Sequence, residues 1–125
     1  MNCLLIDDDA RLRQVLARLL RMSGWDAVHE AGDGEEALSA LLTLHPDLIL
    51  TDCQMPRLDG IAFVRQLRAR GDQTPVIMLS GQGDPHLVVT AIRAGVNNYL
   101  PKPINPEILF EKIEQTLGAA RLAAS

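Results

Sequence analysis

The feature that most constrains the fold is a change of hydrophobic period that recurs along the chain. Short, continuous apolar runs alternate five times with stripes in which apolar residues recur every three or four positions. Continuous runs are typical of strands covered on both faces, and the stripes are typical of amphipathic helices. We therefore predict strands over residues 2–6, 27–30, 48–51, 76–79 and 98–100.

A predicted helix follows each predicted strand. The first four helices are expected to end at residues 23–24, before 45–46, at 71 and at 95, where glycine or proline stands. The fifth begins at Asn105-Pro106, a capping side chain followed by proline, and is expected to end before Gly118. The pattern predicts an α/β fold with a doubly wound, five-stranded parallel sheet of order 2-1-3-4-5. We assign residues 1–118 to one domain and residues 119–125 to a C-terminal tail or the start of a linker.

Composition and charge exclude several classes of protein. A net charge of −4 and only 3% aromatic residues leave neither a basic footprint nor a stacking surface, so we expect no direct nucleic-acid binding. The first apolar run is too short for a signal peptide or a membrane span, which indicates a cytoplasmic protein without membrane contact. Cys3 and Cys53 lack the spacing of a disulfide framework or a metal site. We interpret Cys53 as a small buried hydrophobe rather than a redox sensor.

Polar residues stand directly after four of the five predicted strands. In a doubly wound sheet, ligands bind beyond the carboxyl ends of the strands. The second predicted strand contributes nothing comparable, but the other four strand ends are expected to converge on one shallow pocket. These strands are followed by Asp7-Asp8-Asp9, by Asp52, by Ser80-Gly81 and by Lys102-Pro103.

Such a pocket is electrostatically unfavourable when it is empty. Two carboxylates about 4 Å apart repel by about 4 kcal/mol at an effective dielectric constant near 20. Oxygen ligands without histidine or cysteine favour Mg²⁺, or Mn²⁺, which commonly serves phosphate chemistry. Asp52 is the best candidate for a nucleophile that forms an aspartyl phosphate, and Asp7 and Asp8 for the metal side. Asp9 is expected to cap the first helix, and Ser80 and Lys102 to stabilise a phosphoryl group.

Four motifs in register carry a family resemblance. LLIDDD, DLILTDCQMPRLDG, VIMLSG and NNYLPKP resemble the CheY-like receiver domain of two-component response regulators over residues 2–117. The resemblance implies that Asp7, Asp8, Asp52 and the backbone carbonyl of Gln54 hold Mg²⁺. It also implies that Asp52 accepts a phosphoryl group from a sensor histidine kinase or a phosphotransfer protein.

The resemblance further implies a switch and its readout. Ser80, Tyr99 and Lys102 match the switch hydroxyl, the aromatic rotamer switch and the phosphate-binding cation of the family. Phosphorylation would then alter partner binding, or promote a homodimer, through the surface formed by the fourth helix, fifth strand and fifth helix, while the output partner stays unassigned. The remaining matches are Gly81 beside the phosphate, a cis peptide bond at Lys102-Pro103, and Gln54 and Gln82 at positions that tune dephosphorylation.

The same sequence features are compatible with other functions. A receiver-like adaptor that never takes phosphate would share the fold, although the complete acid, hydroxyl and lysine set argues against it. An aspartate-nucleophile phosphatase needs a second acid where Gln54 stands, and a flavodoxin relative needs a neutral phosphate loop where three aspartates stand. The arginines of the first predicted helix form either a solvated face or a docking surface for the kinase. They are Arg11, Arg13, Arg18 and Arg21.

Overall fold

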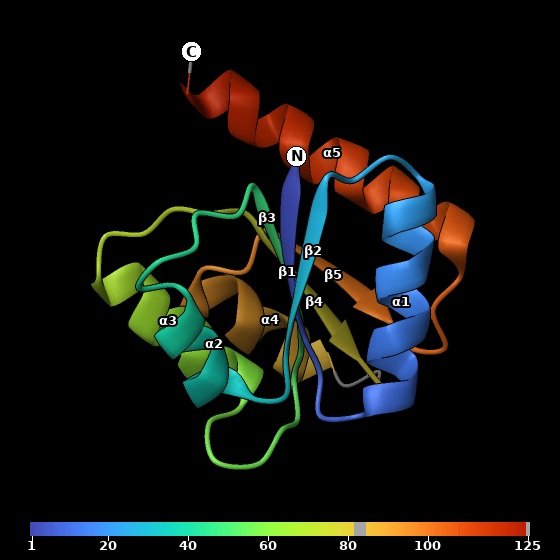
Figure 1. Cartoon of the computed structure of the whole chain (residues 1–125). Helices are drawn as coiled ribbons and strands as arrows, with labels where there is room; N and C mark the ends of the chain where they lie inside the picture. Colours follow the sequence, from blue (N-terminus) through green and yellow to red (C-terminus); the bar gives the residue numbers. More distant parts are fainter. Residues whose placement is uncertain (82–84, 125) are drawn as a thin grey trace.

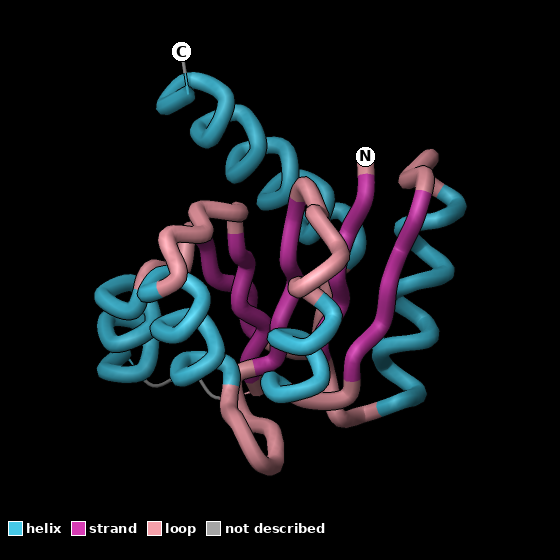
Figure 2. The backbone as a smooth tube through the Cα atoms, turned by 60° about the vertical axis from the view of Figure 1, so that its left-hand side comes forward, coloured by secondary structure: helices cyan, strands magenta, loops and turns pink. Residues whose placement is uncertain are grey.

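Five parallel strands form one sheet in the order β2-β1-β3-β4-β5, as predicted (Figures 1 and 2). The computed structural model describes residues 1–81 and 85–124. The strands are β1 (Asn2–Ile6), β2 (Ala27–Ala31), β3 (Leu48–Asp52), β4 (Val76–Ser80) and β5 (Asn98–Pro101).

Helices cover both faces of this sheet. α1 and α5 lie on one face, and α2, α3 and α4 lie on the other (Figure 1). No helix in residues 1–81 or 85–124 is both long and apolar enough to cross a bilayer. The helices are α1 (Ala10–Met22), α2 (Gly34–Ala40), α3 (Gly60–Ala69), α4 (Pro85–Ala94) and α5 (Pro106–Ala124).

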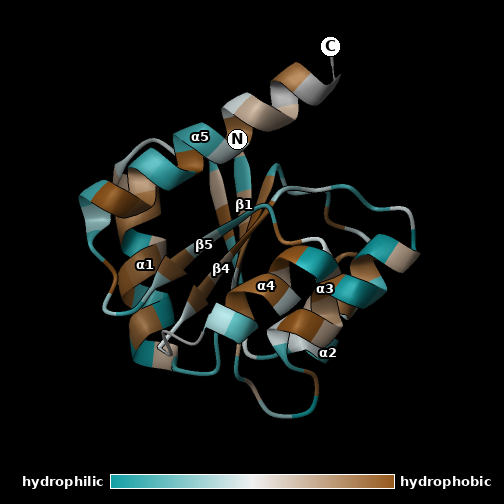
Figure 3. Ribbon diagram, turned by 180° about the vertical axis from the view of Figure 1, so that it is seen from behind, coloured by the Kyte–Doolittle hydropathy of each residue, from teal (hydrophilic) through white to brown (hydrophobic). Residues whose placement is uncertain are grey.

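The strands supply two separate cores because successive side chains point to opposite faces. In β1, Leu4 and Ile6 pack under α2, α3 and α4, whereas Cys3 and Leu5 pack under α1 and α5. This double burial explains why the strands read as continuous apolar runs, which is visible as the hydrophobic colour along β4 in Figure 3. Phe63 is the largest fully buried side chain, and aliphatic residues provide most of the packing.

Side-chain caps fix where the helices begin, close to the strand ends. Oδ1 of Asp9 accepts hydrogen bonds from the backbone N–H groups of Arg11 and Leu12, as the sequence predicted. Asp59 caps α3, and Asn105 caps α5 directly before Pro106. Each cap ends a loop that leaves the carboxyl edge of the sheet, so the caps limit the freedom of the residues at that edge.

Two predicted helix ends differ from the structure. α2 ends at Ala40 rather than near residue 44. The N–H groups of Leu42 and Thr43 donate hydrogen bonds to the carbonyl oxygens three residues earlier, those of Ser39 and Ala40, so the chain forms turns there. α5 does not stop before Gly118 but continues to Ala124. A glycine inside a helix costs only about 1 kcal/mol, and the alanine-rich segment that follows favours helix. The proposed boundary at residue 118 therefore falls inside α5.

Candidate functional site

The carboxyl edge of the sheet brings together the acidic residues that the sequence singled out. One carboxylate oxygen each from Asp7, Asp8 and Asp52 lie within 4.8 Å of one another. Nζ of Lys102 lies 3.2 Å from Oδ2 of Asp7 and 3.3 Å from Oδ1 of Asp52. Asp7 and Asp52 are buried, whereas Asp8 is exposed. Three carboxylates and one ammonium thus share one space.

Strand register explains this convergence. Ile6, the residue before Asp7, pairs with Thr51, the residue before Asp52. Ser80 at the end of β4 pairs with Pro101 on β5, and the N–H of Lys102 donates to the carbonyl oxygen of Ser80 at 2.6 Å. Asp7 after β1, Asp52 at the end of β3 and Lys102 after β5 consequently leave the sheet at the same level.

Asp52 is held in one orientation by two donors. Its Oδ1 accepts a hydrogen bond from the backbone N–H of Cys53 at 2.8 Å, and the same atom is the one that faces Lys102. Burial and the neighbouring carboxylate of Asp7 raise the pKa of Asp52, against the opposing effects of Lys102 and the Cys53 N–H. The ionised carboxylate is therefore less stable here than in water, as expected of a site that gains from a bound cation.

Lys102 responds to the same charges in the opposite sense. Burial disfavours its ammonium, but Asp7 and Asp52 together outweigh burial and raise the pKa of Lys102. Lys102 is therefore a cation near neutral pH. The peptide bond between Lys102 and Pro103 is cis.

The other predicted site residues that the structure describes lie in different environments near the carboxyl edge of the sheet and in its core. Ser80 is buried at the end of β4, and Gly81 after it is exposed. Tyr99 pairs with Met78 across the sheet and packs, half-buried, against the core under α2, α3 and α4. Gln54 is exposed in the loop between β3 and α3. Gln82 lies outside the described residues.

The amino end of α3 approaches the backbone of Asp52 too closely for any side chain. A Cβ atom on Gly60 would lie 2.1 Å from the carbonyl oxygen of Asp52. The Gly60 N–H donates a hydrogen bond to the carbonyl oxygen of Cys53 at 2.8 Å. The absence of a side chain at Gly60 lets α3 pack against the strand end that carries Asp52.

The loop between β3 and α3 is fastened to the start of α2, which the sequence did not indicate. The Arg57 guanidinium forms an ion pair with the buried carboxylate of Asp33, with Nε of Arg57 at 2.8 Å from Oδ2. Asp33 also caps α2 through the N–H of Glu36, and the N–H of Gly34 donates to the carbonyl oxygen of Leu58. Arg57 has a φ of 66°, a left-handed conformation that costs a residue with a side chain about 1 kcal/mol or more.

The cysteines are buried thiols. Burial, with smaller effects from Asp59 and Asp52, raises the pKa of Cys53 to about 11, and burial raises the pKa of Cys3 to about 12. Reactivity towards oxidants depends on the thiolate, so these environments favour the interpretation of Cys53 as a packing residue.

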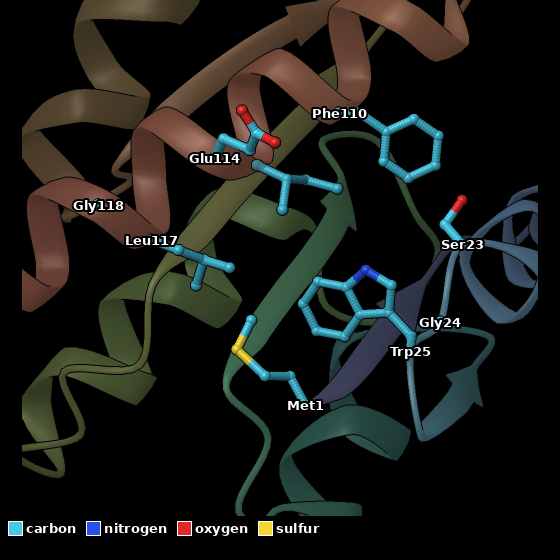
Figure 4. Close-up of a pocket in the computed structure, with 9 residues that line it drawn as sticks. Met1, Ser23, Gly24, Trp25, Phe110, Glu114, Leu117 and Gly118 are labelled. Carbon is cyan, nitrogen blue, oxygen red and sulfur yellow. The ribbon is translucent and has the colours of Figure 1, made fainter.

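A separate pocket of about 500 Å³ opens at the other end of the sheet, beside the start of β1. Figure 4 shows Trp25 facing α5 residues Phe110 and Leu117 across it. None of the residues that line this pocket belongs to the acidic cluster. The candidate site is therefore the acidic cluster at the carboxyl edge and not this pocket.

The donor set fits a hard divalent cation. The cluster of Asp7, Asp8 and Asp52 offers only oxygen atoms, which Mg²⁺ and Mn²⁺ prefer and which Zn²⁺ sites usually supplement with nitrogen or sulfur. Burial and the carboxylate of Asp7 raise the pKa of Asp52 although Lys102 lies 3.3 Å away. A second positive charge at this position would therefore stabilise the folded protein.

Comparison with known proteins agrees with this geometry. A family model described as the response regulator receiver domain matches residues 3–114. A chemotaxis protein CheY homolog of Campylobacter jejuni is 39% identical, covering 94% of this chain and 93% of that protein. The response regulator MprA of Mycobacterium avium is 38% identical over 94% of this chain, which spans 51% of MprA.

Solved structures show the same architecture. The receiver domain of Francisella response regulator 1452 matches with a TM-score of 0.88 and 31% identity, covering 95% of this chain and 98% of that one. The chemotaxis response regulator CheY4 of Vibrio cholerae matches with a TM-score of 0.85 and 31% identity over 92% of this chain and 97% of that one. The chain belongs to the response regulator receiver domain family, the signalling modules of two-component systems.

Proposed function

We propose that this chain accepts a phosphoryl group on Asp52 in a Mg²⁺-dependent reaction and thereby switches its contacts with other proteins. Receiver domains generally bind Mg²⁺ and pair with sensor histidine kinases. The single observation that carries the proposal is the cluster in which Asp7, Asp8 and Asp52 lie within 4.8 Å of one another. Lys102 contacts two of the three carboxylates.

Each residue at the cluster has a proposed role in holding the reacting groups. Asp7, Asp8, Asp52 and the backbone carbonyl of Gln54 would hold Mg²⁺, or Mn²⁺, which when bound neutralises phosphoryl charge. Because Oδ1 of Asp52 is held by the Cys53 N–H and by Lys102, the carboxylate plane is fixed, and we assign the attack to Oδ2. Lys102 and the Ser80 hydroxyl would bind the phosphoryl oxygens after transfer.

The chemical step is a displacement at phosphorus. Oδ2 of Asp52 forms a bond to the phosphorus of a phosphohistidine, and the bond from phosphorus to the imidazole nitrogen breaks. The electron pair of that bond stays on the nitrogen, which takes a proton from solvent, and the product is an aspartyl phosphate. The donor is a sensor histidine kinase or a phosphotransfer protein.

The proposed response links the phosphate to a distant surface. Ser80 would turn towards the phosphoryl group and Tyr99 would change rotamer, altering the surface of α4, β5 and α5. That surface would bind the output partner or a second copy of the chain. Gly81 would lie beside the phosphate, and Gln54 and Gln82 would set how readily water reaches the acyl phosphate.

The exposed side of α1 supports a docking surface for the kinase. Arg11 and Arg18 are exposed there beside the uncovered apolar side chains of Val15 and Met22, which are 56% and 78% exposed. An apolar strip flanked by cations fits a partner helix that carries acidic residues.

The proposal is tested by incubating the protein with acetyl phosphate or phosphoramidate and following its intact mass. We expect one labile phosphoryl group in the presence of Mg²⁺, none with EDTA, and none in Asp52→Ala. Glu111→Gln on the exposed side of α5 serves as a matched control and should be modified like the wild type. An unchanged mass with every donor would instead favour an adaptor that is never phosphorylated.

A further inference from the structure

We propose that Arg13 is a positioning residue for the metal site, an inference that rests on the proposed function above. Arg13 lies in the first turn of α1, which begins at Ala10 shortly after the Asp7-Asp8 pair. Its Nη1 donates to the backbone carbonyl oxygen of Asp7 at 2.6 Å, and its Nε donates to Oε1 of Glu30 at 3.1 Å. One guanidinium therefore joins the end of β2 to the peptide bond between two proposed metal ligands.

The contacted peptide controls where both ligands point. The carbonyl group of Asp7 and the N–H group of Asp8 belong to the same planar unit, so a rotation of that unit changes the directions of the two carboxylates together. On the other side of Asp7, its N–H, which belongs to the preceding peptide unit, donates to the carbonyl oxygen of Ala31 at 3.1 Å. Arg13 completes this support, because without it the Asp7 main chain would be fixed on one side only.

The geometry requires a guanidinium rather than any cation. Arg13 uses two different nitrogen atoms to contact a carbonyl oxygen and a carboxylate at once, and its side chain is only 20% exposed. A lysine carries one compact ammonium and cannot reproduce this fork. Glu30 is itself approached by Arg21 at 3.8 Å, which limits the positions its carboxylate can take.

Arg13 thus differs from the other arginines of α1. Arg11 and Arg18 are exposed and line the outer side of the helix. Arg21 contacts Glu30 as Arg13 does, but its second contact is the carbonyl oxygen of Val28, remote from the acidic cluster. Arg21 is therefore a matched control, because replacing it removes a guanidinium beside Glu30 without releasing Asp7.

The test compares the Mg²⁺ response of Arg13→Lys, Arg21→Lys and the wild type. Urea-unfolding midpoints are measured in EDTA and at increasing Mg²⁺, since a ligand that binds the folded state raises the midpoint according to its affinity. We expect Arg13→Lys to need about tenfold more Mg²⁺ for the same rise, the usual effect of losing a group that orients a metal ligand. Arg21→Lys should follow the wild type.

The outcomes separate a positioning role from a merely structural one. If Arg13→Lys lowers the midpoint equally with and without Mg²⁺, the positioning role is overturned. If the wild type itself does not respond to Mg²⁺, the proposed metal site fails, and the role of Arg13 fails with it. Glu30→Gln provides a second test that keeps Arg13 and its bond to Asp7 but weakens its anchor. Glu30→Gln should raise the Mg²⁺ concentration needed for a given rise in the midpoint, by a smaller factor than Arg13→Lys does. If neither Glu30→Gln nor Arg13→Lys changes that concentration, the proposal is also overturned.

Discussion

Removing the charge of Asp52 should stabilise the metal-free protein. The carboxylate oxygens lie within 4.8 Å of one another, so at an effective dielectric constant of about 20 Asp7 and Asp8 each repel Asp52 by about 3.5 kcal/mol or more. Lys102 at 3.3 Å attracts it by about 5 kcal/mol, which leaves a net repulsion of about 2 kcal/mol. Because Asp8 is exposed and its charge is screened, we expect Asp52→Asn to gain about 1 kcal/mol in the free energy of unfolding.

The assay is urea or thermal unfolding in EDTA, followed by circular dichroism. A gain of about 1 kcal/mol corresponds to a rise of about 4 °C in Tm for a domain of this size. Glu111→Gln removes one exposed negative charge on α5 and controls for net charge. Added Mg²⁺ should stabilise the wild type more than Asp52→Asn. If Asp52→Asn unfolds below the wild type in EDTA, carboxylate crowding is not what shapes this site.

The stability difference between the wild type and Asp52→Asn should also depend on pH. The folded state raises the pKa of Asp52, so between the ordinary value of 3.8 and the folded value the native protein binds more protons than the unfolded chain. Asp52 therefore adds stability as the pH falls through that interval. The gain of Asp52→Asn over the wild type, measured in EDTA, should shrink as the pH is lowered towards 3.8.

Three further outcomes test the supports around the site. Gly60→Ala should lose about 2 kcal/mol or more and slow phosphorylation, because its Cβ would lie 2.1 Å from the Asp52 carbonyl oxygen; wild-type unfolding midpoints would contradict this close approach. Asp33→Asn should lose about 1 kcal/mol at pH 7. The N–H of Glu36 and, despite burial, Arg57 lower the pKa of Asp33. The contribution of Asp33 to the free energy of unfolding is therefore present above the ordinary pKa of 3.8 and is lost as the pH falls below it. A stability difference from the wild type that does not change with pH would refute that cause. Reversing the charges of Arg11 and Arg18 to Glu should slow transfer from the kinase and abolish its salt dependence while leaving modification by acetyl phosphate intact; an unchanged kinase rate removes the docking surface.

The fold was predictable because its main signals are local. Burial on both faces makes each strand a continuous apolar run, and capping residues such as Asp9 and Asn105 mark helix starts in the sequence itself. Helix ends were less predictable. Gly118 has the chemistry of a stop signal, but the alanine-rich segment after it forms helix up to Ala124.

The sequence also predicts only part of the candidate site. Parallel topology alone predicts that the residues at the carboxyl ends of β1, β3 and β5 converge. Asp7, Asp8, Asp52 and Lys102 do so. The residues that orient them were missed, because their contacts join positions far apart in the chain. The sequence does not distinguish Arg13 from the other arginines of its helix. Nothing in the sequence near Glu30 indicates that it contacts Arg13, 17 residues away.

The central claim is that Asp52, among all the acidic residues here, takes the phosphoryl group. The most direct measurement is peptide mapping of protein treated with acetyl phosphate and Mg²⁺ and then reduced with borohydride, which converts an acyl phosphate to an alcohol. We predict that Asp52 alone is reduced and that no reduced residue is found when Mg²⁺ is withheld. Reduction at Asp7 or Asp8, or at Asp52 to the same extent with EDTA, would contradict it.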